Sequence, residues 1–197
     1  MKNTIRLGFL AWAALIGTGA VHATAIMGGN PVISQPNVDS FQDFAILDKN
    51  NPISGTGILT QWQIYAGAIE PVQLLIYAQT GANTYAVIGS SLSQIPVLGL
   101  NTFTLSTPIA VQAGDFVGLF FSNTGSVDFA PLVANLGNLS GSVLFTGDNS
   151  GSTTNFIDST TRTYSVDVSG IATPEPSSLA LAGAALLALA WAARNRK

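Results

Sequence analysis

Hydrophobic and polar residues alternate with a period of two along most of the middle of the chain. In residues 58–66 this alternation places Trp62 with Ile58 and Ile64 on one face of an extended strand. The other face presents three polar or amphipathic side chains: Gln61, Gln63 and Tyr65. Similar strand patterns recur at residues 72–78, 84–89, 101–105 and 116–122, and more weakly at 41–47, 127–129, 142–146 and 162–168. No helical period is sustained there, so the middle is predicted to consist of short β-strands.

Turn-forming residues separate these segments. Clusters of Gly, Asn, Asp and Pro lie between them, and Gly and Asn tolerate the positive φ that tight turns require. Eight or nine short strands at this spacing predict an all-β fold, an antiparallel β-sandwich that is jelly-roll-like. Residues 116–122 are apolar on both faces, which predicts a central strand covered on each side.

The first residues of the chain have the pattern of a secretory signal peptide. Lys2 and Arg6 precede the uncharged apolar residues 7–16, a run too short to span a bilayer. Small residues then permit cleavage after Ala23 or Ala25. A buried N-terminal helix is the competing interpretation, but the flanks fit export. We therefore assign residues 1–23 to a signal peptide and expect the chain to be exported.

Residues 173–197 have a second, different apolar pattern. Pro174, Glu175 and Pro176 form a stiff break that a helix cannot run through. The next 17 residues, 177–193, are uncharged and rich in Leu and Ala, and a helix of that length measures about 25 Å. Basic residues follow it. This order predicts a short transmembrane helix whose basic tail stays in the cytoplasm.

The order of Pro-Glu-Pro, apolar span and basic tail resembles the PEP-CTERM sorting signal of Gram-negative, exopolysaccharide-producing bacteria. In that family an exosortase, a membrane-embedded protease and transpeptidase, processes the chain near the Pro-Glu-Pro motif. The resemblance implies that this chain is a substrate of such an enzyme, anchored in the inner membrane and then released to the cell surface or the extracellular space. The implied roles are recognition by Pro174, Glu175 and Pro176, temporary anchoring by residues 179–193, and retention by Arg194, Arg196 and Lys197.

Charge and cysteine content narrow the function of the middle domain, residues 24–172. It has only two cations, Lys49 and Arg162, against nine carboxylates, for a net charge of −7. Such a domain cannot neutralise a row of phosphates, so nucleic acid is not an expected partner. The chain has no cysteine. Disulfides and lipoprotein acylation are therefore excluded, and the domain depends on its hydrophobic core.

The domain also lacks the usual catalytic side chains. The sole histidine, His22, lies in the predicted signal peptide. The domain therefore has no histidine to act as the base of a serine or cysteine hydrolase or as a zinc ligand. A glycosidase needs only two carboxylates, and Glu70 is the candidate for one of them. A solvated loop carboxylate is the favoured interpretation of Glu70. We expect a protein that is not an enzyme.

Calcium is the one cofactor for which the sequence offers candidate ligands. Asp148 and Ser150, with Asp158 beyond them, place oxygen atoms at alternate positions of a loop. A plain polar turn is the favoured interpretation, because the spacing is not that of an EF-hand. The other acidic cluster in the sequence comprises Asp39, Asp43 and Asp48.

Carbohydrate binding is the remaining candidate chemistry. Tyr65 shares a strand face with Gln61 and Gln63, and Tyr77 shares one with Gln73. If the two strands are neighbours, these side chains form a polar and aromatic strip suited to a sugar, although the outer face of any sandwich has such residues.

Residues 58–62, 74–77 and 111–118 resemble a loose set of extracellular β-sandwich domains of bacterial surface proteins.

The function expected from the sequence is therefore a non-enzymatic structural or adhesive role in an exopolysaccharide layer. The alternative is a carbohydrate-binding module assisted by calcium.

Overall fold

The computed structural model describes residues 24–82, 84–131, 143–146, 153–156, 158–173 and 176–194. Thr24–Ala172 forms one compact unit, and Thr173–Lys197 belongs to a second unit together with Met1–Ala23. The predicted signal peptide, residues 1–23, lies outside the described residues.

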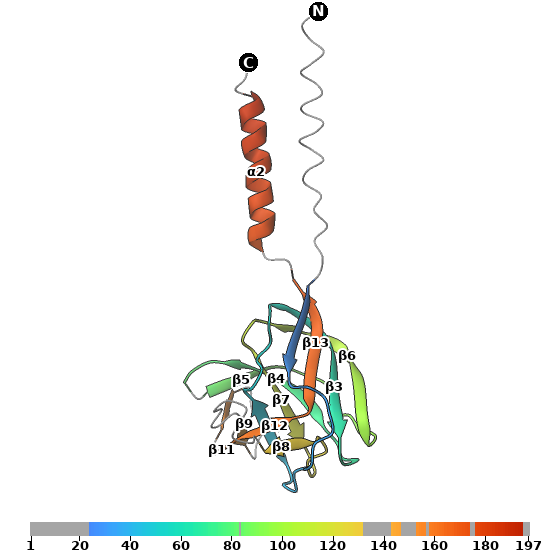
Figure 1. Cartoon of the computed structure of the whole chain (residues 1–197). Coiled ribbons are helices and arrows are strands. Elements are labelled where there is room, and N and C mark those ends of the chain that lie inside the picture. The colour runs from blue at the N-terminus through green and yellow to red at the C-terminus, as the bar shows by residue number, and fades with distance from the viewer. Residues whose placement is uncertain are drawn as a thin grey trace, which may run out of the picture. The chain divides into compact units, whose positions relative to one another are not determined.

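The described part of Thr24–Ala172 consists of β-strands joined by turns and loops (Figure 1). In chain order they are β1 (Ala25–Gly29), β2 (Phe44–Asp48), β3 (Gly57–Ala66), β4 (Gln73–Gln79), β5 (Thr84–Ser90), β6 (Gly99–Val111), β7 (Phe116–Phe121), β8 (Phe129–Pro131), β9 (Val143–Thr146), β10 (Thr153–Asn155), β11 (Asp158–Thr160), β12 (Arg162–Tyr164) and β13 (Val166–Ala172).

The strands form three antiparallel sheets. The four-stranded sheet has the order β1-β13-β3-β6, and the seven-stranded sheet has the order β10-β5-β4-β7-β2-β9-β11. The third sheet pairs β12 with β8. The all-β, antiparallel prediction is therefore confirmed.

The main hydrophobic cluster contains side chains from both larger sheets. Trp62 and Ile64 of β3 are buried in it together with Leu74 and Ile76 of β4. The Trp62 ring lies 4.6 Å from that of Phe103, which extends the contact onto β6. The inner faces of the two sheets thus share one core, as the alternation around Trp62 predicts.

A second cluster covers the opposite face of the seven-stranded sheet. It contains Tyr77 and Tyr85, and Phe116 and Phe156 pack against it. Central strand β7 lies between β4 and β2 and is covered on both faces, with Phe116 and Phe120 half-buried on one of them, which confirms the predicted central strand. Gly118 of β7 has no side chain, and the Tyr77 ring occupies the space that a Cβ would need.

One residue of β3 departs from the predicted alternation. Ile58 is 41% exposed, although it was predicted to share the buried face of Trp62. The register of β3 shifts between Leu59 and Gln61, relative to both β6 and β13. Relative to β13, β3 contains one extra residue here, whereas opposite β6 the extra residues lie in β6, between Thr104 and Ile109. At this bulge Leu59 turns inward and Ile58 turns outward.

The first and last strands of the unit lie side by side. Ala25 of β1 pairs with Ile171 of β13, and the Ala172 N–H donates to the Thr24 carbonyl at 2.8 Å. Along β3, Gly57 pairs with Ala172, while Ala66 pairs with Gly99 at the other end. Both boundaries of the unit therefore lie at the end of the sheet where β3 begins.

Helix α2 (Pro176–Arg194) is the described element of the second unit. It begins at Pro176, a position where the missing N–H of proline costs no helical hydrogen bond. Arg194 in the last turn interacts favourably with the helix dipole. Among the described residues, no helix combines the length and the apolar character needed to cross a membrane. The transmembrane helix stays a prediction.

Candidate functional site

The outer face of the four-stranded sheet presents a continuous polar surface, which we call the polar face. Gln61 and Gln63 of β3 are half-buried on it. In the neighbouring strands, Gln61 pairs with Thr104 and Ser169, and Gln63 pairs with Thr102 and Asp167. The polar face comprises Gln61, Gln63, Thr102, Thr104, Asp167 and Ser169.

Side-chain hydrogen bonds connect this face across its strands. Gln63 Nε2 donates to Thr102 Oγ1 at 2.9 Å, and Ser169 Oγ donates to Gln61 Oε1 at 3.5 Å. Burial raises the pKa of Asp167 on the same surface. The face is thus a row of amide, hydroxyl and carboxyl groups, which is the chemistry that hydrogen-bonds sugar hydroxyls.

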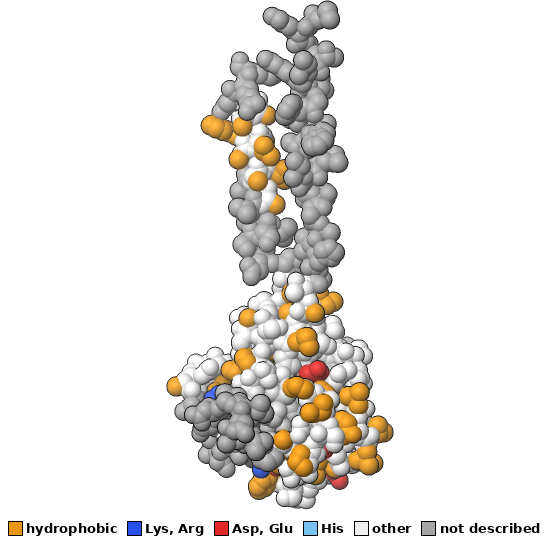
Figure 2. Space-filling view, viewed as in Figure 1, with side chains coloured by type: hydrophobic (Ala, Val, Ile, Leu, Met, Phe, Trp, Pro, Cys, Tyr) orange, Lys and Arg blue, Asp and Glu red, His pale blue; other side chains and the backbone are white. Residues whose placement is uncertain are grey.

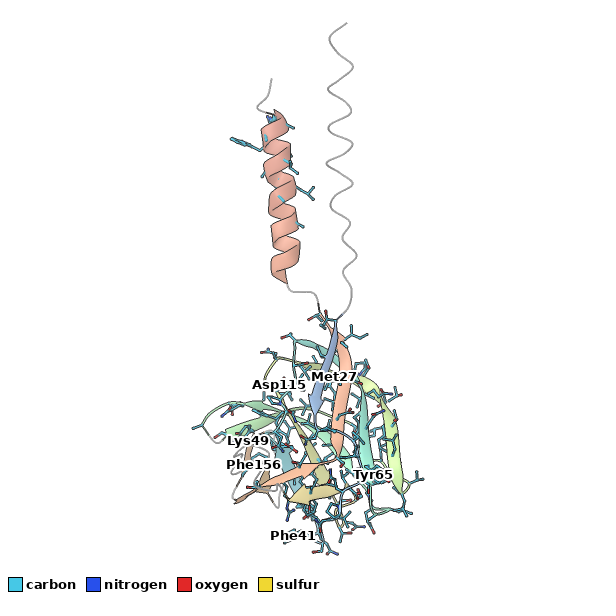
Figure 3. The ribbon with its side chains drawn as sticks, in the orientation of Figure 1. Met27, Phe41, Lys49, Tyr65, Asp115 and Phe156 are labelled. Atoms are coloured by element: carbon cyan, nitrogen blue, oxygen red, sulfur yellow. The ribbon has the colours of Figure 1, made fainter. Side chains whose placement is uncertain are left out.

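Tyr65 continues this face toward the end of β3 (Figure 3). It borders an open hollow of about 370 Å³. Asp128 Oδ2 accepts a hydrogen bond from the Gln35 backbone N–H at 2.9 Å, and the Asp128 N–H donates to the Tyr65 carbonyl. The hollow is lined by Ser34, Gln35, Pro36, Asn37, Val38, Tyr65, Ala66, Gly67, Leu98, Gly99 and Asp128. An aromatic ring beside amide and carboxyl groups is suited to a sugar ring.

The strip predicted from two neighbouring strands does not form. Strands β3 and β4 belong to different sheets, so Gln73 and Tyr77 are not beside Gln61 and Tyr65. Tyr77 is fully buried in the second cluster, and burial raises the pKa of its hydroxyl. Gln73 Nε2 donates at 2.7 Å to the carbonyl of Ser91, the residue that follows β5 of the same sheet. Of the two aromatic candidates, Tyr65 borders the hollow described above, and Tyr77 is not exposed.

The polar residues around this hollow were not identified from the sequence. Gln35 and Asn37 come from a segment without a strand period, so alternation could not place them. Asp128 lies within the weak strand pattern of residues 127–129, which did not indicate that it borders a hollow. The Ser-Gln-Pro-Asn sequence at residues 34–37 is a turn signal, and it was the one indication that this segment lies at a surface.

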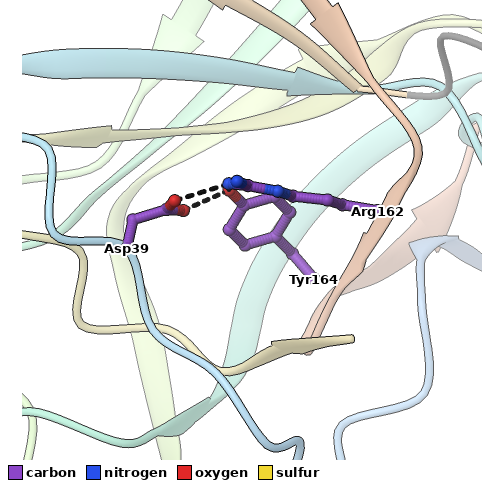
Figure 4. Close-up of polar contacts among 3 residues, drawn as sticks. All are labelled: Asp39, Arg162 and Tyr164. Atoms are coloured by element: carbon purple, nitrogen blue, oxygen red, sulfur yellow. Dashed lines mark hydrogen bonds and ion pairs between the residues drawn. The ribbon is translucent and has the colours of Figure 1, made fainter. Parts of the chain in front are cut away.

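Asp39 belongs to a buried polar cluster (Figure 4). Its carboxylate accepts hydrogen bonds from Arg162 Nη1 and from the Tyr164 hydroxyl. The Arg162 guanidinium also lies 4.1 Å from the centre of the Phe129 ring. Burial and the adjacent Asp39 carboxylate raise the pKa of Tyr164 well above its usual value. These groups satisfy one another, so the cluster has a structural role.

The acidic cluster predicted at Asp39, Asp43 and Asp48 does not form a common site. Asp48 is buried and accepts hydrogen bonds from the Asn30 side chain at 2.7 Å and the Asn50 N–H at 2.8 Å. Asp43 is exposed, with a positive φ of 52°. Within the described ranges, no group of three carboxylate or histidine side chains could hold a metal ion.

The calcium ligands predicted from the sequence lie apart from the hollow and are only partly described. Asp148 and Ser150 lie outside the described residues, and Asp158 begins β11. Glu70 lies in the loop between β3 and β4, and its Oε2 accepts a hydrogen bond from Asn123 Nδ2 at 3.0 Å.

The predicted sorting residues lie at the two ends of helix α2 and in the sequence just beyond them. Pro176 is its first residue and Arg194 its last. Pro174, Glu175, Arg196 and Lys197 lie outside the described residues.

Comparison with known proteins identifies this last segment. No curated protein and no solved structure matches the chain. Residues 172–197 match the family model of the PEP-CTERM protein-sorting motif. This match begins at the last residue of β13 and spans all of α2. The chain therefore contains a PEP-CTERM protein-sorting motif, the mark of an exported protein that an exosortase-type enzyme processes at the membrane.

Proposed function

We propose that this chain is a non-enzymatic protein of the cell surface or extracellular matrix, with a structural or adhesive role in an exopolysaccharide layer. The match of residues 172–197 to the sorting motif is the observation that carries the proposal. A separate compact unit, Thr24–Ala172, precedes that motif and would be the part delivered.

The delivered unit is proposed to be a jelly-roll β-sandwich. Its support is the strand order β1-β13-β3-β6 in one sheet and β2-β7-β4-β5 within the other, with a core shared between them. The chain crosses between these sheets after β1, β2, β3, β5 and β6, and such repeated crossing is a feature of jelly rolls. Such sandwiches present broad outer faces that suit structural and adhesive roles.

Export is proposed to use both ends of the chain. Residues 1–23 would serve as the signal peptide. Residues 179–193 would be a temporary membrane anchor, retained by Arg194, Arg196 and Lys197. The processing enzyme would then act near Pro174, Glu175 and Pro176. The mature protein would be the Thr24–Ala172 unit with a short remnant at its C-terminal side.

The carboxylates of the unit support a role without catalysis. Asp39 and Asp48 are buried and accept hydrogen bonds from neighbouring side chains. Asp115 Oδ2 accepts from the Gln112 N–H at 2.7 Å, and Asp128 accepts from Gln35. These acids fix turns and loops, so they are already committed to the fold.

Substitution of the motif tests the sorting proposal. We expect Pro174→Ala combined with Glu175→Ala to leave the unprocessed chain in the membrane fraction, while Ser177→Ala is processed normally. Fractionation and intact-mass measurement of the surface and secreted protein would follow processing. Normal processing and surface delivery of the double variant would contradict the proposal.

A carbohydrate-binding module is the second candidate function, and the hollow beside Tyr65 favours it. This candidate predicts saturable binding of the Thr24–Ala172 unit to a glycan, including the host's exopolysaccharide, in an array screened with and without calcium. Tyr65→Ala should weaken that binding about two- to tenfold, the loss expected for one stacked aromatic ring. A folded sample that binds no glycan would exclude this candidate.

A further inference from the structure

An exposed group of aliphatic side chains lies in the loop between β5 and β6 and at the start of β6. We call it the apolar ridge. Its five members are each more than half exposed: Leu92 (67%), Ile95 (69%), Val97 (66%), Leu98 (63%) and Leu100 (59%). Single exposed aliphatic residues are common, but five within nine positions indicate an interaction surface. Figure 2 shows hydrophobic side chains on the surface of the unit in the region of β3 and β6.

Polar contacts hold the ridge in place. The buried Asn101 side chain donates to the carbonyls of Val97 and Gly99 and accepts from the Val97 N–H at 2.9 Å. Gln94 and Val72 exchange two backbone hydrogen bonds, of 2.8 and 2.9 Å. The aliphatic side chains are therefore exposed on an ordered loop. A surface organised in advance loses little conformational entropy when a partner binds.

The ridge is continuous with an edge strand. In the described part of the four-stranded sheet, β6 is the terminal strand, so only one of its sides is paired. Edge strands that must not pair usually have charged residues, yet residues 71–114 contain none. Residues 99–104 of β6 pair in regular register with β3, residues 105–108 fall in the register shift, and Pro108 ends the stretch that can offer backbone groups to another strand.

Charge favours a second copy of this chain as that other strand. The unit has a net charge of −7, so two copies repel each other over most of their surfaces. The uncharged segment forms the ridge and the edge strand, where two copies can approach without this cost. An identical partner also supplies an identical edge, and self-complementary contacts of this kind give two-fold dimers.

We propose that two copies associate through antiparallel pairing of their β6 strands, centred on Phe103. With Phe103 at the centre, residues 99–107 of the two copies pair with each other, and Pro108 stays outside the ladder. It places Thr102 opposite Thr104 of the second copy, and Leu100 opposite Ser106. The ridge of each copy then covers the exposed end of β6 on the other. The two four-stranded sheets become one continuous sheet.

The position of the ridge argues for a second copy over a membrane surface. Leu100 pairs with Tyr65, near the end of β3, whereas Ala172 pairs with Gly57 at its beginning. The chain continues from Ala172 into the sorting motif. Within the unit, Tyr65 lies near one end of the four-stranded sheet (Figure 3), and Ala25, which pairs with Ile171, lies at the other. The ridge is therefore remote from the residue that leads to the membrane-processed segment.

The first test is the oligomeric state of the Thr24–Ala172 unit, which contains both hydrophobic clusters. Sedimentation equilibrium should give a dimer that dissociates at least about tenfold more readily in Leu98→Asp/Leu100→Asp. Met27→Asp/Ile171→Asp is the matched control, because its sites are 57% and 53% exposed and add the same charge. A monomeric wild type up to about 1 mM, or equal weakening by both variants, would overturn the proposal.

The second test reports on the pairing itself and uses the absence of native cysteine. Thr102→Cys mixed with Thr104→Cys should oxidise rapidly to a disulfide-linked heterodimer, because opposed residues lie about 5 Å apart. Thr102→Cys mixed with Ile171→Cys is the control and should not. A cross-linking rate no higher than that of the control would overturn the β6 pairing, even if the unit dimerises.

Discussion

Arg162 of β12 forms an ion pair with Asp39, which precedes it in the chain by 123 positions. The side chain of Asp39 is 3% exposed and that of Arg162 is 20% exposed. The pair, with Tyr164, holds the segment before β2 against β12. Arg162 is one of only two cations in residues 24–172. This domain thus uses half of its positive charge to neutralise a buried carboxylate.

Removal of Arg162 should be costly, because it leaves the Asp39 carboxylate buried without its cation. We expect Arg162→Met to lower the free energy of unfolding by about 3–5 kcal/mol, and Asp39→Asn in the same chain to restore part of it. Lys49→Met removes the other, exposed cation and should change stability by less than about 0.5 kcal/mol. Urea unfolding measures all three. Equal effects of Arg162→Met and Lys49→Met would refute the structural role of the pair.

The stability of the domain should depend on pH through Asp48. Burial raises the pKa of Asp48 to about 6, from an ordinary value of 3.8, although hydrogen bonds from Asn50 and Asn30 oppose the shift. The folded protein therefore binds this proton more tightly than the unfolded chain does. The contribution to stability is full below pH 4 and is lost as the pH rises through 6, a fall of about 3 kcal/mol.

Asp48→Asn isolates this contribution. The difference in unfolding free energy between wild type and Asp48→Asn should change by about 3 kcal/mol from pH 4 to pH 7 and stay constant above pH 7. Burial raises the pKa of Asp167 as well, so that residue adds a dependence of the same sign in both proteins. A difference that is independent of pH would show that Asp48 is not buried as described.

Tyr77 should have no part in ligand binding. Its hydroxyl is buried and has no hydrogen-bond partner among the described residues. Because an unsatisfied buried hydroxyl costs about 1–3 kcal/mol, Tyr77→Phe should leave thermal stability unchanged or raise it. Any glycan binding should be unaffected by Tyr77→Phe and reduced by Tyr65→Ala. Loss of binding in Tyr77→Phe, with the fold retained, would contradict this placement.

Gly118 is required by the close approach of two neighbours. A Cβ at this position would clash with the Ile46 carbonyl oxygen and with the Tyr77 ring. Gly118→Ala should therefore lower the unfolding free energy by about 1–3 kcal/mol or more. At Gly81 the nearest atom would be 3.5 Å away, so Gly81→Ala serves as the control with a small effect. Equal melting temperatures for both variants would contradict the packing around Gly118.

Sequence periodicity predicted which residues share a strand face, but it could not show which strands are neighbours. Gln73 and Tyr77 lie on the same face of β4, as predicted, yet that face is covered by side chains that include Phe156. Phe156 follows β10, far along the chain, so no local pattern in residues 72–78 indicates its presence. A two-residue period can identify the faces of a strand without showing which of them meets solvent.

Local irregularities were also invisible in the sequence. Nothing in residues 58–61 marks the register shift that moves Ile58 outward, because it is set by pairing with two other strands. The sorting motif, in contrast, depends on the order of residues and not on tertiary contacts. Its position could therefore be predicted from the sequence, and the family model confirms it at residues 172–197.

The pairing of β13 has a mechanical consequence. Strand β13 is hydrogen-bonded to β1 on one side and to β3 on the other, and the chain leaves it at Ala172 toward the sorting motif. A force that pulls Ala172 away from the opposite end of the sheet acts along β13, perpendicular to its hydrogen bonds with β1 and β3. Those bonds are then loaded together in shear and do not open one at a time. A protein held at this end would resist pulling better than its thermodynamic stability alone suggests.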